Sequence, residues 1–445
     1  MRIDSIHIEN FRGIRKLDME FDPRFTLLVG DNGSGKTSIL SALSVVLGIW
    51  HVSKIVTGAK QWRNIMDHEI HEVPGEDENG ERQFLPAGNV FLKAKGSIGA
   101  RQPQAWIRLK KGRKLRTIDK GEESTVSDIL SALAARERKQ EPLPLLTCYG
   151  AGRAWLPSNQ RELVDLSGDL KSRPEDGYYD CLNERIRVKD VMKWFVLQAA
   201  KRDESGQFKP AFEAVRLAMK RGIPGVDEIY WDHIKGEVVV SIDGKAQPFS
   251  NLSHGQITMA ATLADMAIRA VSLNSHLLGN GNGGAHPEQV LDQTPGVVLI
   301  DEVDVHLHPE WQRRVVRDLL TTFPKVQFIC TSHSPQTMGE VPALVGKDRL
   351  GDIWILDSGG PRRPAVHYAD SNWNLEHQMG AAVNARNKDV AQLLNEAESA
   401  MIEHDLDDAT KALMEARRMM GGEDGELTRL ESSLETLKML EHADD

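Results

Sequence analysis

The sequence predicts an α/β fold with a mixed or parallel sheet, an inserted helical and β-hairpin region, and an all-α C-terminal tail. Near the N-terminus, the apolar run FTLLVG leads into the glycine-rich stretch GDNGSGKTS and then into the helical pattern TSILSALSVVLGI. Farther along, apolar strands such as GVVLID and VQFICTSH alternate with amphipathic helices, which favours a parallel sheet. Beyond about residue 376, apolar residues at helical spacing continue in a polar background.

These patterns divide the chain into four segments. Residues 1–50 and 246–375 carry the α/β patterns and are expected to form two parts of one domain. Residues 51–245 are expected to form the inserted region, in which the loop 72–83 has a composition that favours disorder. Residues 376–445 are expected to form the helical tail.

The composition indicates a globular protein of a reducing compartment. The chain has 445 residues, of which 40% are hydrophobic, and this is enough to bury substantial cores. No apolar run reaches the roughly 20 residues of a membrane span, and the alternating start MRIDSIHIEN is typical of a strand rather than of a signal peptide. Cys148, Cys181 and Cys330 are widely spaced, which favours buried thiols over disulfides or a metal site. We therefore expect a cytoplasmic protein with no membrane association.

The charge is unevenly distributed. The chain has a net charge of −10, and residues 376–445 alone hold 17 acidic and 7 basic residues. Such an acidic tail is a poor surface for nucleic acid and a good one for a basic protein. In contrast, the basic segment Lys93–Lys120 contains ten Lys and Arg residues and one acid, Asp119. This segment predicts either a nucleic-acid-binding hairpin or a solvated edge that lysines protect from aggregation.

The stretch Gly30–Ser38 has the spacing G-x-x-x-x-G-K-T of a phosphate-binding loop. Its glycines allow backbone N–H groups to approach a phosphate chain closely, and the N-terminus of the next helix attracts the anion. Lys36 is expected to reach the β- and γ-phosphates, and Thr37 is expected to hold Mg²⁺. The predicted ATP-binding residues in this loop are Gly30, Asp31, Asn32, Gly33, Ser34, Gly35, Lys36, Thr37 and Ser38. The chain is therefore predicted to bind ATP or GTP.

An acidic motif, VVLIDEVDVHLHP, combines an apolar strand with two adjacent carboxylates. Asp301 reaches the carboxyl end of the strand, where open α/β sheets bind ligands, and is expected to hold Mg²⁺ through water. Glu302 is placed to polarise the water that attacks the γ-phosphate. His306 and His308 are expected to pack or to form an interface rather than to bind a metal.

Two further motifs flank the acidic one. NLSHGQ, at residues 251–256, precedes a helix, so Ser253 is either an ordinary N-cap or part of an anion contact at the helix N-terminus. ICTSHSP places His333 directly after another apolar strand. A histidine there is either structural or, given its order after the acidic motif, functional.

Together, IENFRGI, GDNGSGKT, LSHGQ, LIDEVDVHLHP and TSHSP resemble the motifs of SMC/RecF-like ABC-type ATPase heads, in the bacterial group called AAA-family ATPases of defence systems. The middle segment has no sustained a/d heptad repeat, so no coiled-coil arm is expected, and the tail is helical. Within this group, these two features are similar to PtuA, the ATPase of Septu anti-phage systems and related retrons. The resemblance implies Mg²⁺-dependent ATP hydrolysis by a homodimer or higher homo-oligomer joined through the heads.

The resemblance also implies roles for individual residues. Glu302 and His333 are catalytic, Asp304 lies in a loop at the dimer interface, and Arg12 of IENFRGI contacts the nucleotide. The signature of one chain caps the ATP bound by another and consists of Ser253, His254, Gly255 and Gln256. His254 stands where the family has glycine. No glutamine occupies the Q-loop position, and Arg153 of LLTCYGAGRAW stands there instead.

Two functions remain open. The first is the ATPase subunit of an anti-phage system, which assembles with and regulates a PtuB-like nuclease of the HNH type docked on the tail. The alternative is a RecF/SMC-like ATPase that binds DNA in repair, through the basic segment. DLDD at 405–408 is expected to be a turn with a helix cap rather than a nuclease site, between helices predicted at 389–403, 406–420 and 424–441. Any cutting of nucleic acid is therefore expected to belong to another subunit.

Overall fold

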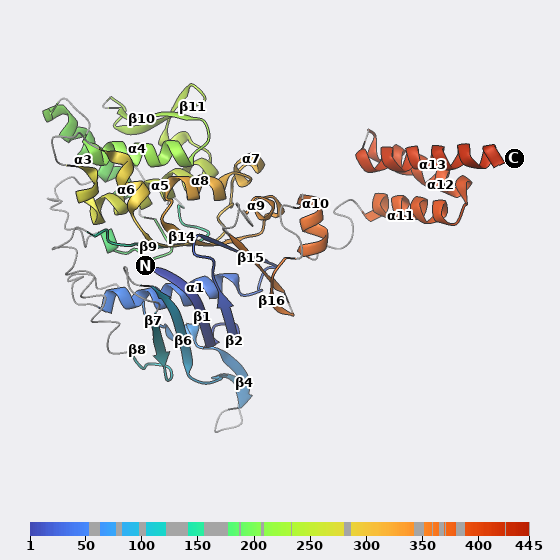
Figure 1. Ribbon diagram of the computed structural model, residues 1–445. Helices are drawn as coiled ribbons and strands as arrows, with labels where there is room; N and C mark the ends of the chain where they lie inside the picture. The colour runs from blue at the N-terminus through green and yellow to red at the C-terminus, as the bar shows by residue number, and fades with distance from the viewer. Residues whose placement is uncertain are drawn as a thin grey trace. The chain divides into compact units, whose positions relative to one another are not determined.

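The structure is a computed structural model of the chain (Figure 1). It describes residues 1–52, 63–76, 82–97, 104–121, 141–154, 177–186, 188–205, 209–232, 234–279, 286–341, 351–357, 359–364, 369, 371–379, 388–422 and 424–444. The chain forms two compact units, Met1–Ser371 and Asn372–Asp445. Among the described residues, no helix has both the length and the apolar character needed to cross a membrane.

A six-stranded sheet forms the centre of the first unit. Its strands, in spatial order, are β16 (Gly360–Arg362), β15 (Asp352–Asp357), β3 (Phe25–Gly30), β14 (Val326–Ser332), β13 (Gly296–Ile300) and β9 (Leu145–Tyr149). All neighbouring pairs from β15 to β9 are parallel, and β16 is antiparallel to β15. Every residue of β3, β13, β14 and β9 is buried, as is typical of parallel strands covered on both faces. The predicted α/β fold with a mixed sheet is confirmed. Because β3, β13 and β14 are parallel, their carboxyl ends lie at the same edge of the sheet.

A second sheet, which is antiparallel, contains strands from the region 51–245 that was expected to be inserted. It contains β2 (Ile14–Glu20), β1 (Arg2–Phe11), β6 (Val90–Ser97), β7 (Gln104–Lys110) and β8 (Ile118–Gly121), in this spatial order. Helix α1 (Lys36–Leu47) contacts strands of both sheets and lies between them (Figure 1). Its residues from Ile39 to Leu47 are all buried, because both sides of the helix are covered. Strands of the region 51–245 thus complete the surroundings of the helix that follows the phosphate-binding loop.

Helices and a three-stranded meander complete the first unit. The helices are α3 (Val188–Ser205), α4 (Pro210–Gly222), α5 (His254–Leu273), α6 (Pro287–Gln293), α7 (Pro309–Gln312), α8 (Val315–Thr322) and α9 (Pro335–Gly339). The meander consists of β10 (Val226–Asp232), β11 (Glu237–Ile242) and β12 (Lys245–Pro248). The loop expected at 72–83 instead contributes to a hairpin of β4 (Glu72–Glu76) and β5 (Arg82–Pro86), and its residues 77–81 lie outside the described ranges.

Two cations of the basic segment, Arg108 and Lys110, are internal, which corrects both expectations for these two residues. On β7, Trp106, Arg108 and Lys110 are 0%, 1% and 5% exposed. Arg108 donates to the Val45 carbonyl at 2.8 Å, and Lys110 Nζ donates to the Ile65 carbonyl at 2.9 Å. β7 is also no edge strand, since it lies between β6 and β8. Neither a nucleic-acid surface nor a solvated edge therefore describes Arg108 and Lys110.

The second unit includes the last two residues of α10 (Ser371–Trp373). Its described residues also form three longer helices, α11 (Lys388–Ile402), α12 (Leu406–Met420) and α13 (Gly425–Asp444). They share a core of buried apolar residues: Val390, Leu394, Ala397, Met401, Leu406, Ala409, Leu413, Ala416, Leu427, Leu430 and Leu434. Asp405 caps α12, because its Oδ1 accepts a hydrogen bond from the backbone N–H of Asp408 at 3.0 Å. The helical tail and the capped turn at 405–408 are confirmed.

Candidate active site

The phosphate-binding loop surrounds a cavity of about 250 Å³ at the N-terminus of α1. Gly35, with φ 97°, is the N-cap of α1 and adopts a left-handed conformation that favours glycine. Lys36 is 6% exposed, and its Nζ donates to the carbonyls of Gly30 at 2.7 Å and Asp31 at 2.8 Å. Burial lowers the pKa of the Lys36 ammonium. The residues that line the cavity are Gly13, Ile14, Asn32, Gly33, Ser34, Gly35, Lys36, Thr37, Ser38, Asp301, Glu302 and His333.

Asp301 and Thr37 meet at this cavity from two different elements. Thr37 Oγ1 donates to Asp301 Oδ2 at 2.9 Å, and Thr331 Oγ1 of β14 donates to Asp301 Oδ1 at 2.6 Å. A carboxylate and a hydroxyl are hard oxygen ligands of the kind that Mg²⁺ prefers. The residues present therefore fit the ion. Thr331 was not predicted as a site residue, although it lies two positions before His333.

Glu302 occupies a turn immediately after β13 and has a φ of 47°, which is uncommon for a residue with a side chain. Its backbone N–H donates to Thr331 Oγ1 at 2.7 Å, and the N–H of Val303 donates to the Thr331 carbonyl at 3.0 Å. The turn thus packs against β14, and Glu302 lines the cavity of the phosphate-binding loop together with His333. The two residues predicted to be catalytic are brought together.

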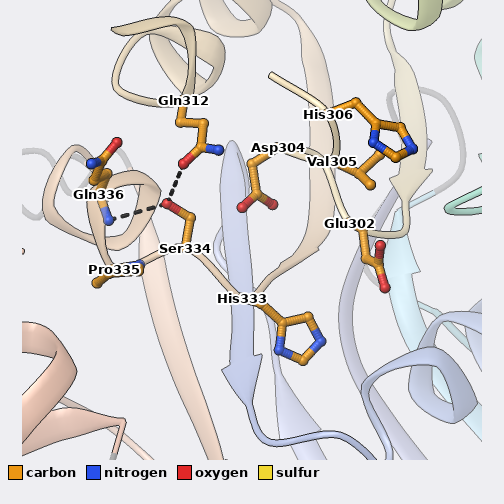
Figure 2. Close-up of a pocket in the computed structure, with 9 residues that line it drawn as sticks. All are labelled: Glu302, Asp304, Val305, His306, Gln312, His333, Ser334, Pro335 and Gln336. Atoms are coloured by element: carbon orange, nitrogen blue, oxygen red, sulfur yellow. Dashed lines mark hydrogen bonds between the residues drawn. The ribbon is translucent and has the colours of Figure 1, made fainter. Parts of the chain in front are cut away.

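A second cavity, of about 380 Å³, also contains Glu302 and His333 (Figure 2). Its other lining residues are Asp304, Val305, His306, Gln312, Ser334, Pro335 and Gln336. Figure 2 shows Asp304 between the Ser334 side of the cavity and the Glu302 side. Asp304 is 7% exposed and burial raises its pKa, while its Oδ1 has no hydrogen-bond partner among the described residues. On the opposite side, Ser334 Oγ donates to Gln312 Oε1 at 2.8 Å.

The signature stretch forms the start of α5. Ser253 is its N-cap and accepts from the N–H of Gln256 at 3.3 Å, while Gln256 Oε1 accepts from the N–H of Ser253 at 2.9 Å. Gly255 is buried, and a Cβ at this position would lie 2.3 Å from the His306 carbonyl oxygen. The exposed ring of His254 lies 6.2 Å from that of His306, centroid to centroid. Ser253 and Gln256 therefore form a capping box. The signature also packs closely against His306, in the turn after Glu302.

Arg12 and Arg153 have different surroundings from those expected. Arg12 Nη2 donates to Glu69 Oε1 at 2.9 Å, and the stretch IENFRGI reaches the cavity through Gly13 and Ile14 instead. Arg153 does not line the cavity of the phosphate-binding loop. It is 3% exposed, and its Nη1 donates to the Asp301 carbonyl at 2.8 Å. The expectation that Arg153 takes the place of a Q-loop glutamine at the nucleotide is therefore not supported by its position.

The chain is similar to several known ATPases and repair proteins. The chain is 23% identical to the retron Ec83 probable ATPase of Escherichia coli, over 98% of this chain and 87% of that protein. It is 26% identical to the Septu protein PtuA of Bacillus mycoides, over 77% of this chain but only 40% of PtuA. A shorter stretch, 22% of this chain and 28% of the other protein, is 56% identical to the DNA replication and repair protein RecF of Pasteurella multocida. Residues 2–349 match the RecF/RecN/SMC N-terminal domain, and the chain belongs to this family.

Proposed function

We propose that the chain is the ATP-hydrolysing subunit of a cytoplasmic bacterial anti-phage system and that it assembles with and regulates a nuclease of the HNH type. The observation that carries this proposal is the convergence of Lys36, Asp301, Glu302 and His333 on one cavity. The similarity to a retron ATPase extends over nearly the whole chain, which supports the biological setting.

The residues around the cavity match the needs of phosphoryl transfer, which depends on positioning and on neutralising charge. Lys36, at the N-terminus of α1, contributes positive charge for the β- and γ-phosphates, and backbone N–H groups of the loop add to it. Glu302 orients and deprotonates the attacking water, and His333 contacts the γ-phosphate. Mg²⁺, held by Thr37 and Asp301, would supply further neutralisation of the phosphate charge.

We further propose that the complete site forms between two chains. Ser253 and His254 are exposed at the N-terminus of α5, where N–H groups and the helix dipole attract anions. In a homodimer or higher homo-oligomer, this signature would cap ATP bound by the second chain. Asp304 would then lie at the interface, through the cavity that it shares with Glu302 and His333.

The tail is the proposed docking site for the nuclease subunit. It forms a compact unit of its own with a buried core, and most of its charged side chains are exposed. Residues 376–445 hold 17 acidic against 7 basic residues, which favours a basic protein surface over nucleic acid.

The second candidate function, a DNA-binding ATPase of repair, is favoured by the cations that remain exposed. Lys111, Lys114 and Arg116 lie exposed between β7 and β8. The similarity to RecF is confined to about a fifth of this chain, however, and two of the other cations of the basic segment are internal.

The test is expression of the chain with its genomic neighbours. We expect ATP hydrolysis that Lys36→Ala abolishes, co-purification of a nuclease, and phage protection that depends on both. ATP-dependent binding of DNA without any nuclease partner would replace this proposal by the repair function.

A further inference from the structure

Arg153 has surroundings that neither the proposed catalytic chemistry nor the family resemblance explains. It lies in the turn after β9, which is parallel to β13, and its own N–H donates to the Gly150 carbonyl at 3.1 Å. The N–H of Ile186 donates to the Arg153 carbonyl at 2.8 Å, so the backbone of the turn is held from two sides. The side chain then points to the turn that carries Glu302.

The guanidinium group of Arg153 donates to carbonyls of three consecutive residues. Nη1 lies 2.8 Å from the Asp301 oxygen and 3.3 Å from the Glu302 oxygen, and Nη2 lies 3.4 Å from Glu302 and 3.5 Å from Val303. Among the described residues, no carboxylate forms an ion pair with Arg153. A planar fork with five N–H donors suits such a cluster of acceptors, whereas an ammonium group does not.

Burying the Arg153 guanidinium costs free energy, and its hydrogen bonds must offset that cost. Arg153 is 3% exposed, and burial lowers the pKa of its guanidinium to about 10, so that it stays protonated at neutral pH. A buried charge without a carboxylate partner must be compensated by hydrogen bonds. The carbonyls of Asp301, Glu302 and Val303 provide this compensation.

The turn that Arg153 holds is the strained one. A left-handed conformation of a residue other than glycine is strained and persists only when the surroundings fix it. Glu302, with φ 47°, is fixed on its N–H side by Thr331 and on its carbonyl side by Arg153. Without the second contact, the peptide units on both sides of Glu302 would be free to rotate toward an ordinary conformation, and its carboxylate would turn with them.

The signature helix holds the guanidinium from the other side. Arg153 Nε donates to Thr262 Oγ1 at 3.3 Å, and the same hydroxyl donates to the Thr258 carbonyl within α5 at 2.7 Å. The Thr262 hydroxyl therefore has a fixed direction and presents its lone pair to Arg153. Because α5 begins at the signature residues, one side chain connects this helix to the turn of Glu302.

We propose that Arg153 is a positioning residue for ATP hydrolysis, which holds the Glu302 carboxylate toward the nucleotide through the carbonyls of residues 301–303. This inference rests on the proposed function. It also assigns a role to Thr262, which orients the Arg153 side chain from the signature helix.

The test compares Arg153→Lys and Thr262→Val with the wild-type protein. Arg153→Lys keeps the charge and loses the fork, and is expected to lower kcat by about 10²-fold, the loss typical of a misplaced reactive group. The KM for ATP should stay within about twofold, since the phosphate-binding loop is untouched. Thr262→Val removes only the hydroxyl and should lower kcat less, in the same direction. In a Glu302→Gln background, Arg153→Lys should have little further effect, because the base that it positions is gone.

Hydrogen exchange provides a readout that does not depend on turnover. In Arg153→Lys, faster exchange is expected at the amides of Glu302 and Val303 and not in the interior of β13 or β14. A variant with wild-type kcat, or one that loses ATP affinity and overall stability together, would overturn the positioning role. Full additivity with Glu302→Gln would do the same. If the wild-type protein itself does not hydrolyse ATP, the proposed function fails, whereas an active wild type with an unaffected Arg153→Lys variant refutes the role of Arg153 alone.

Discussion

Replacing Arg108 with methionine is expected to destabilise the Met1–Ser371 unit by about 2–4 kcal/mol. Methionine fills most of the space of the aliphatic stem, so the loss is mainly polar. Arg108 donates to the Val45 carbonyl at 2.8 Å, the Arg63 carbonyl at 3.1 Å and Asn64 Oδ1 at 2.8 Å. In the variant, the Val45 carbonyl still accepts a hydrogen bond from the N–H of Gly48. The Arg63 carbonyl and Asn64 Oδ1 lose the hydrogen bonds that Arg108 donates to them. Each acceptor left without a partner costs about 1–3 kcal/mol, and removing a buried charge offsets part of the sum.

The assay is urea unfolding of the full chain, followed by tryptophan fluorescence, with Arg116→Met as the matched control. Arg116 is exposed on the same segment, so its replacement should change the free energy of unfolding by no more than about 0.5 kcal/mol. Equal midpoints for the two variants would refute the internal role of Arg108. Loss of affinity for nucleic acid in a fully stable Arg108→Met protein would restore the surface interpretation.

Three further predictions concern the proposed function. Glu302→Gln should bind ATP normally and lower the hydrolysis rate by about 10²–10⁴-fold, measured by phosphate release, because the base is lost while Asp301 remains; a wild-type rate would mean that another group activates the water. Ser253→Arg should keep ATP binding and abolish ATP-dependent dimerisation in light scattering, and mixing it with Lys36→Ala should restore some hydrolysis, because one hybrid site keeps both intact halves. No recovery in such mixtures would place the whole site within one chain. Deleting residues 372–445, the complete second unit, should preserve ATP binding and release the nuclease during co-purification, and a nuclease that stays bound to the shortened chain would exclude the tail as its docking site.

The core of the site was predictable because each of its motifs is local. The loop around Lys36, the acids after β13 and the histidine after β14 each follow an apolar strand, and parallel strands bring their carboxyl ends to one edge. Chain order alone therefore identified residues that are far apart in sequence and close in space. The tail helices were predictable for the same reason, since their apolar residues recur at helical spacing.

The internal cations were not predictable in this way, because their partners are distant in the sequence. Arg153 contacts carbonyls almost 150 residues later, and backbone carbonyls carry no sequence signal. The alternation of Trp106, Arg108 and Lys110 does indicate one face of a strand. An arginine and a lysine on that face are nevertheless expected to be exposed, because most cations are. Glu69, which accepts a hydrogen bond from Arg12, is not predictable because nothing in its local sequence marks a buried carboxylate.

The buried face of β7 is explained by the C-terminal end of α1. The last carbonyls of a helix lack partners within it, and a helix that is covered by two sheets cannot satisfy them with water. Trp106 Nε1 donates to the Val46 carbonyl at 3.0 Å, and Arg108 donates to that of Val45. The Arg108 cation also lies at the negative end of the helix dipole. The inserted strand thus stabilises the helix whose other end forms the phosphate site.

A role of the basic segment in binding nucleic acid falls to its exposed part, around Lys111 and Arg116. Replacing these exposed cations, with Arg108 and Lys110 left intact, separates loss of binding from loss of the fold.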